Sequence, residues 1–121
     1  MKKTMAHEYI DMAASEARSK YITVGAGQES TYLLKAQHAK EYKAAGYTGT
    51  IPLLVQAEMN ATGEEAQVCA DSIIFQELQW IYLAGSIETI RRSGKIAISA
   101  LTDPEEIANK CEEVVNTLHQ I

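Results

Sequence analysis

Apolar residues recur at helical spacing through one long stretch of the chain, residues 62–101, which contains no proline. The pattern predicts one long helix or two helices in tandem. At about 1.5 Å per residue, an unbroken helix over this stretch is roughly 57 Å long, whereas a compact chain of this size is only about 35 Å across. We therefore expect the helix either to break or to project beyond its own core, and a projecting apolar helix needs a partner.

Two apolar stripes follow this long helix. One comprises Ile73, Trp80, Ala84, Ile87, Ile90 or Arg91, Gly94, Ile98 and Leu101, and the other comprises Ile74, Leu78, Ile81 and Tyr82. Residues 73–84 are consequently apolar nearly all round, which is typical of a segment buried from two sides. Gly/Ser pairs are a recurring cause of helix kinks, so Gly85-Ser86 and Ser93-Gly94 are the places where a kink would occur if the helix is not straight.

Shorter helices are predicted on either side of the long one. Helical periodicity covers residues 3–19, and a second helix over 31–45 is bounded by Ser30 as N-cap and Gly46 as C-cap glycine. Residues 21–27 read as a short irregular or strand-like segment. The sequence therefore predicts an all-α protein of four to five helices around one long, kinked or straight helix.

Capping signals place the remaining helix boundaries. Pro52 fits the first turn of a short helix over 52–60, and Thr62 with Glu65 forms a capping box for the long helix. The run Asp103-Pro104-Glu105-Glu106 starts a last helix. We expect residues 1–121 to form a single helical domain: an N-terminal helix over 1–20, a central region over 21–101 and a C-terminal helix over 102–121.

Composition limits the classes of partner. Apolar residues make up 46% of the 121 residues and charged residues 22%, which excludes wholesale disorder. The net charge of −5 argues against nucleic acid as the main partner. Cys69 and Cys111 are too isolated for a disulfide framework or a zinc ribbon, and no apolar run is long enough for a signal peptide or a membrane span.

The candidate chemical motifs are incomplete. The run V-G-A-G-Q-E-S over 24–30 has Ser30 where a dinucleotide-binding turn has its third glycine, and no βαβ unit follows. The run His7-Glu8 with Asp11 lacks the third ligand that catalytic zinc needs. We assign no catalytic, cofactor-binding or metal-binding residue, and an enzyme that uses the 25–30 turn for a phosphate-bearing ligand stays the least favoured alternative.

The basic run over residues 91–95 and the aromatic residues of the long helix suggest contact sites. The basic run fits a solvated helix turn, a contact with the acidic last helix, or an acidic partner. Trp80 and Tyr82 fit either an interaction hot spot or an ordinary core. The predicted contact residues are Ile73, Leu78, Trp80, Tyr82, Ile87 and Arg91, with Gly27, Gln28 and Glu29 as a second candidate contact in the 21–30 loop.

Three segments together resemble a helical module of tailed bacteriophages. They are residues 17–39 (ARSKYITVGAGQESTYLLKAQHA), 61–67 (ATGEEAQ) and 80–98 (WIYLAGSIETIRRSGKIAI). The module is found in small phage proteins and towards the C-terminal ends of tail and tail-fibre-associated proteins. The resemblance spans most of the chain but carries no chemistry, and this chain adds a first helix and a capped last helix of its own.

The resemblance implies a non-enzymatic structural role in the tail or tail-fibre region of a virion assembled in the bacterial host cytoplasm. The implied partners are other phage structural proteins of the tail, fibre or head-tail region and further copies of this chain, because symmetric particles multiply any self-complementary surface. No nucleic acid, membrane or cofactor is expected. The alternative is a tail-fibre assembly chaperone that is absent from the mature virion.

Overall fold

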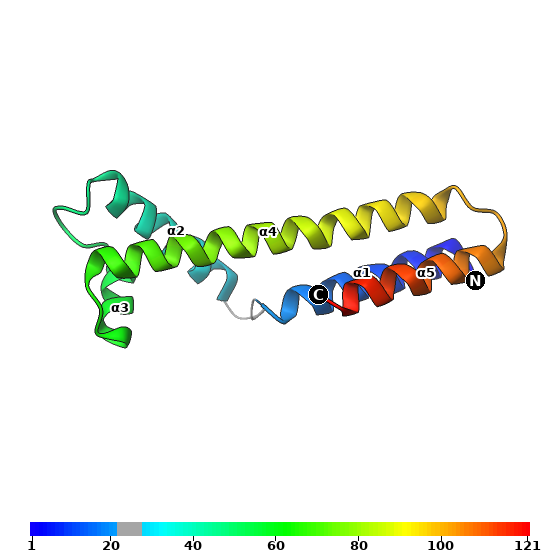
Figure 1. The fold of residues 1–121 in the computed structure, drawn as a ribbon, viewed down its shortest axis with the longest axis horizontal. Helices are drawn as coiled ribbons and strands as arrows, with labels where there is room; N and C mark the ends of the chain where they lie inside the picture. Colours follow the sequence, from blue (N-terminus) through cyan, green and yellow to red (C-terminus); the bar gives the residue numbers. More distant parts are fainter. Residues whose placement is uncertain (22–27) are drawn as a thin grey trace. The chain divides into compact units, whose positions relative to one another are not determined.

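The described residues form five α-helices. The computed structural model describes residues 1–21 and 28–121, and side chains at 1–21 and 30–121. The helices are α1 (Lys3–Ser19), α2 (Gln28–Ala44), α3 (Leu53–Thr62), α4 (Ala66–Ser99) and α5 (Pro104–His119) (Figure 1). The described residues contain no strand, so the all-α prediction is confirmed. The predicted strand-like segment covers residues 21–27, and all of it except Tyr21 lies outside the described residues.

The long helix is shorter at its N-terminus than predicted. Gly63 adopts a left-handed conformation (φ 75°) and its N–H donates to the carbonyl of Met59, which ends α3. Thr62 therefore closes α3, where its hydroxyl donates to the carbonyl of Glu58 (2.9 Å), and it does not cap α4. From Ala66, α4 runs as one assigned helix through Gly85 and Gly94 to Ser99.

Helix α2 ends as its sequence predicts, at Gly46. The N–H of Gly46 donates to the carbonyl of Lys43, and the N–H of Tyr47 donates to the carbonyl of Tyr42. This pair of bonds, with Gly46 at φ 72°, is a Schellman motif. The rings of Tyr42 and Tyr47 meet edge to face, with centroids 5.8 Å apart, which supplies the apolar contact that accompanies the motif.

The chain divides into two compact units, whereas the sequence predicts one domain. The terminal unit comprises residues 1–21 and 82–121, and the central unit comprises residues 28–81. Helix α4 contributes its N-terminal part to the central unit and its C-terminal part to the terminal unit. Each unit has a hydrophobic cluster of its own.

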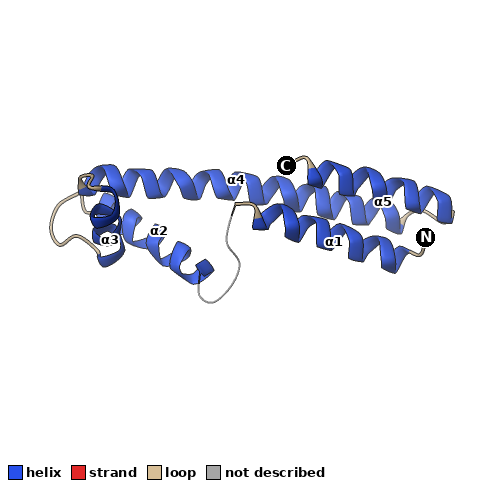
Figure 2. Ribbon diagram, turned by 90° about the horizontal axis from the view of Figure 1, so that it is seen from below, coloured by secondary structure: helices blue, strands red, loops and turns tan. Residues whose placement is uncertain are grey.

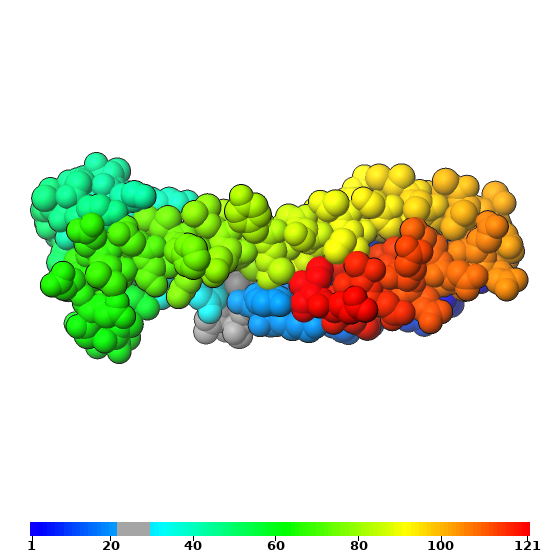
Figure 3. Space-filling model, viewed as in Figure 1, coloured from blue at the N-terminus to red at the C-terminus, as the bar shows by residue number. Residues whose placement is uncertain are grey.

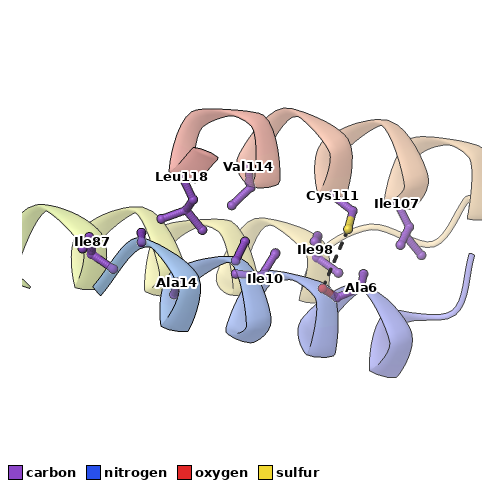
Figure 4. Packing of buried hydrophobic residues seen from close by; sticks show 11 residues of the cluster. Ala6, Ile10, Ala14, Ile87, Ile98, Ile107, Cys111, Val114 and Leu118 are labelled. Carbon is purple, nitrogen blue, oxygen red and sulfur yellow. Dashed lines mark hydrogen bonds between the residues drawn. The ribbon is translucent and has the colours of Figure 1, made fainter. Parts of the chain in front are cut away.

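The core of the terminal unit lies between α1, α5 and the C-terminal part of α4 (Figures 2 and 3). Ile10 of α1, Ile87 and Ile98 of α4 and Leu118 of α5 are fully buried there (Figure 4). Helix α1 contributes mostly alanines to this core, namely Ala6, Ala13, Ala14 and Ala17. Small side chains on one helix allow its neighbours to approach closely, so the three helices pack as a bundle.

Ion pairs join α1 to α4 within this unit. Asp11 accepts from Lys95 at 2.9 Å and lies 3.3 Å from the guanidinium of Arg91. Arg18 and Glu88 make a longer pair at 3.7 Å. These side chains are partly exposed, so the pairs orient α1 against α4 more than they stabilise it.

The core of the central unit lies between α2, α3 and the N-terminal part of α4. Its members are Ala39, Tyr42, Val55, Ala66, Cys69, Ala70 and Ile73. Pro52, at the N-cap of α3, has no side-chain acceptor, and the ring nitrogen Nδ1 of His38 instead accepts from the N–H of Leu54 at 3.2 Å. Ion pairs from Lys35 to Glu58 (2.6 Å) and from Lys40 to Glu77 tie α2 to α3 and α4.

Candidate interaction surfaces

The predicted contact residues separate into buried and exposed groups. Ile73 (5% exposed) and Ile87 (fully buried) belong to the cores of the central and terminal units. They therefore hold the chain's own helices together and present no surface to a partner. Leu78 and Tyr82 lie on the surface of α4, with 49% and 79% of their area exposed, and Trp80 is half-buried. Contact through Leu78 and Tyr82 stays a prediction.

Arg91 has intramolecular partners in the terminal unit. Its guanidinium lies 3.3 Å from Asp11 and 3.7 Å from Glu88, and its side chain is mostly buried. The structure thus uses Arg91 to hold α1 against α4. The predicted salt bridge between the basic run and the acidic last helix is not among the ion pairs of the described residues, because Asp11 and Glu88 take the cations instead.

The second predicted contact falls largely beyond what can be described. Gly27 lies outside the described residues. Gln28 and Glu29 form the first turn of α2, and only their backbone is described. Contact of a partner with these three residues therefore stays a prediction.

Four large apolar side chains are exposed on the central unit's part of α4, namely Val68 (48%) and three that follow one another at intervals of three residues. Phe75, Leu78 and Ile81 are 60%, 49% and 53% exposed, and we call them the α4 surface. They are spaced by three residues, so they lie on adjoining parts of one helix face. Ile73, in the core, lies on the other side of the helix from Leu78, and Glu77, between these two around the helix, pairs with Lys40. The side chains of the α4 surface are therefore largely exposed, although Ile74 in the same stripe packs against the core of the unit.

Phe75 and Ile81 are not among the predicted contact residues, and Phe75 is the one that the apolar stripes also omit. It falls between the two stripes assigned from periodicity, and neither stripe includes it. A usable signal was the scarcity of charge around it: between Asp71 and Glu88 the only charged residue is Glu77. Surface helices usually alternate apolar and charged faces, so an uncharged stretch with one covered face leaves apolar side chains exposed on the other.

A second apolar feature lies in the terminal unit. A groove of about 410 Å³ runs between α1 and α5 and includes Tyr9, Met12 and Val115 in its lining. Tyr9 and Met12 are 47% and 57% exposed. Beneath them Cys111 donates to the carbonyl of Ala6 (Figure 4), and burial raises the pKa of the Cys111 thiol. That thiol therefore stays protonated and is a packing group of the groove floor.

Other chemical features of the described residues are few. No group of three or more His, Cys, Asp or Glu side chains in the described part of the chain could hold a metal ion. Among the helices described, none combines the length and the apolar character that crossing a bilayer requires. Comparison of the sequence with protein-family models, with curated proteins and with solved structures finds no match in any of the three.

Proposed function

We propose that this chain is a non-enzymatic structural protein of the tail or tail-fibre region of a tailed bacteriophage, and that it acts by helix-mediated association. The α4 surface is the observation that carries the association. Phe75, Leu78 and Ile81 remain about half exposed or more although the same helix buries Ile73 in a core. A helix that keeps large apolar side chains in water gains free energy when a partner covers them.

The phage assignment is supported by the sequence resemblance over residues 17–100. Two of its three segments fall on α1–α2 and on α4, the elements that frame the two cores. In a particle with rotational symmetry, one uncovered apolar surface is repeated around the axis, so a modest patch on each copy yields a stable ring. Other copies of this chain and neighbouring tail or fibre proteins are the proposed partners.

The test for association measures molar mass by light scattering over a range of concentrations. We expect a defined oligomer for the wild-type chain and a shift towards monomer for Leu78→Asp, because a charge in the centre of the α4 surface must be desolvated on contact. Gln76→Asp on the same helix is the matched control, since Gln76 is exposed and polar already. A wild-type chain that stays monomeric at all concentrations would contradict self-association.

The test for a place in the virion is mass spectrometry of gradient-purified particles, with copy number referred to the major capsid protein. We expect a fixed stoichiometry, and the copy number would identify the symmetry axis involved. If the chain is abundant in the infected lysate and missing from the particles, the structural role is wrong and the assembly chaperone takes its place.

A further inference from the structure

The α1–α5 groove has the form of a helix-binding site. In the terminal unit, α1 and α5 pack side by side, and α4 covers the core along one side of this pair. On the groove side no third helix of the unit fills the space of about 410 Å³ that Met12 and Val115 border. Two adjacent helices with an apolar groove between them can accommodate the apolar face of another helix.

The side chains of the groove suit an adaptable apolar contact. Met1 and Met12 line it, and Met5 lies on the same helix with 45% of its area exposed. Methionine is unbranched and polarisable, so it conforms to differently shaped apolar partners. Tyr9 adds a large flat surface with a polar tip, which is a common anchor at interfaces.

The charges of the groove select the partner. The charged groups on the residues that line it are the carboxylates of Glu16 and Glu112 and the terminal ammonium of Met1, which donates to the carbonyl of Pro104 at 3.2 Å. The ring nitrogen of His119 lies 3.4 Å from Glu16. No lysine or arginine is among the described residues that line the groove. A second copy docked groove to groove would bring these glutamates towards each other, and like charges at an interface are unfavourable. Positive charge on the partner is favourable for the same reason.

We propose that the α1–α5 groove binds an amphipathic helix of a partner protein whose apolar face is flanked by lysine or arginine. The apolar face of that helix covers Tyr9, Met12 and Val115, and its basic flanks pair with Glu16 and Glu112. This contact is separate from the α4 surface in the central unit. The chain would then have two association sites of different character, one uncharged and one acidic.

The experiment uses two model helical peptides of about 18 residues on the full chain. Both carry leucine at positions that repeat every three to four residues, and the other positions are lysine in one peptide and glutamate in the other. The chain is labelled at its methionine methyl groups, of which it has four, Met1, Met5, Met12 and Met59. We expect the lysine peptide to shift the Met12 signal and to leave that of Met59, in the central unit, unchanged.

Matched variants distinguish binding in the groove from non-specific binding of the peptide. Met12→Gln should weaken binding of the lysine peptide about tenfold, because burying such a side chain is typically worth that factor. Ile96→Gln is its control, since Ile96 is equally exposed on α4 (59% against 57%) but does not line the groove. Glu112→Lys should also weaken binding, whereas Glu113→Lys, on the next residue of α5 and outside the groove, should weaken it less.

Several results would overturn the proposal. Equal binding of the lysine and glutamate peptides would show that the groove does not select for positive charge. Equal losses of affinity in Met12→Gln and Ile96→Gln would show that the peptide does not bind in the groove. If neither peptide moves the Met12 signal, or if Met12→Gln abolishes self-association, the groove is not a site for a basic helix. The peptide-binding outcomes do not bear on the light-scattering result for Leu78→Asp, so the two proposals can fail separately.

Discussion

A single tyrosine holds the loop after α2 against α4. Tyr47 is the non-glycine residue with a positive φ (58°) among the described residues, a conformation that costs a bulky side chain some free energy. Its ring packs on Tyr42 and its hydroxyl donates to Asp71 of α4 at 2.5 Å. These two contacts offset the strain and explain why a tyrosine occupies a position that glycine would fill more readily.

The bond to Asp71 gives Tyr47 a stability effect that depends on pH. The hydrogen bond first, then partial burial and the Asp71 charge, raise the pKa of Tyr47 above its usual value near 10. A pKa raised on folding stabilises the folded chain below the unfolded value, and this contribution is lost as the pH rises through the folded value. We therefore expect the urea midpoint of unfolding to be higher for the wild type than for Tyr47→Phe at neutral pH. The difference between the two midpoints should disappear above about pH 10.

Tyr32→Phe is the control for this titration. Tyr32 is an exposed tyrosine of the central unit, and its hydroxyl has no hydrogen bond among the described residues. Its substitution should leave the urea midpoint unchanged at neutral pH. A gap between wild type and Tyr47→Phe that persists or widens above pH 10 would contradict the assigned role of Asp71. The pairing joins residues 24 positions apart, and no local pattern in the sequence points to it.

At the scale of the element, the two glycines of α4 differ in their surroundings. A Cβ built on Gly94 would lie 2.8 Å from Cγ1 and 2.9 Å from Cγ2 of Val114, whereas a Cβ on Gly85 meets nothing within 4 Å. Gly94 is fully inside the bundle and lets α5 approach α4 closely. Gly85 is exposed and has no packing duty within the described structure.

We predict that alanine at the two positions acts in opposite directions. Gly85→Ala should stabilise the chain by about 0.5–1 kcal/mol through helix propensity. Gly94→Ala gains the same propensity but should destabilise overall, because overpacking a well-filled site costs about 1–3 kcal/mol and both methyls of Val114 are in the way. Urea unfolding of both variants checks this. A stabilised Gly94→Ala would mean that α4 and α5 separate at little cost.

Helix boundaries were predictable where a residue had only one reasonable role. Gly46 was identified as a C-cap because glycine after a periodic segment favours the left-handed conformation, and the structure confirms it. Thr62 with Glu65 predicts a cap for the long helix, and this prediction is wrong, because Thr62 lies in the last turn of α3. Gly63 decides the matter, since its left-handed φ ends α3 and delays α4 to Ala66. The expectation of a kink at Gly85 or Gly94 is not confirmed.

The surfaces were harder to predict than the helices. Ile73 and Leu78 lie five residues apart on α4, and periodicity marks both as apolar without telling which one faces a core. That choice depends on α2, because the pairing of Lys40 with Glu77 shows which side of α4 meets α2. The groove depends likewise on the packing of α1 against α5, whose residues are about 100 positions apart.

For the whole molecule, the main departure from the sequence prediction is the presence of two cores where one was expected. The two clusters share no residue, although α4 contributes to both. The buried apolar side chains are divided between the two clusters. Each unit is held together by a small hydrophobic cluster, so we expect the free energy of unfolding of each unit to be modest.

Two separate cores predict two separately responding regions. Ile10→Ala removes a fully buried side chain of the terminal unit and should cost about 2–5 kcal/mol. Val55→Ala does the same in the central unit at a cost of about 2 kcal/mol. Because no cluster residue is shared, each loss should raise local opening mainly in its own unit.

Hydrogen exchange followed by mass spectrometry resolves this, since peptides from the two parts of α4 report on different units. With Ile10→Ala, residues 82–99 should lose protection while residues 66–81 keep most of theirs, and Val55→Ala should give the reverse. Continuity of α4 works against this separation, because helix formation is cooperative along the chain. If either variant weakens both parts equally, that cooperativity outweighs the division of the cores, and the chain unfolds as the single domain that its sequence predicts.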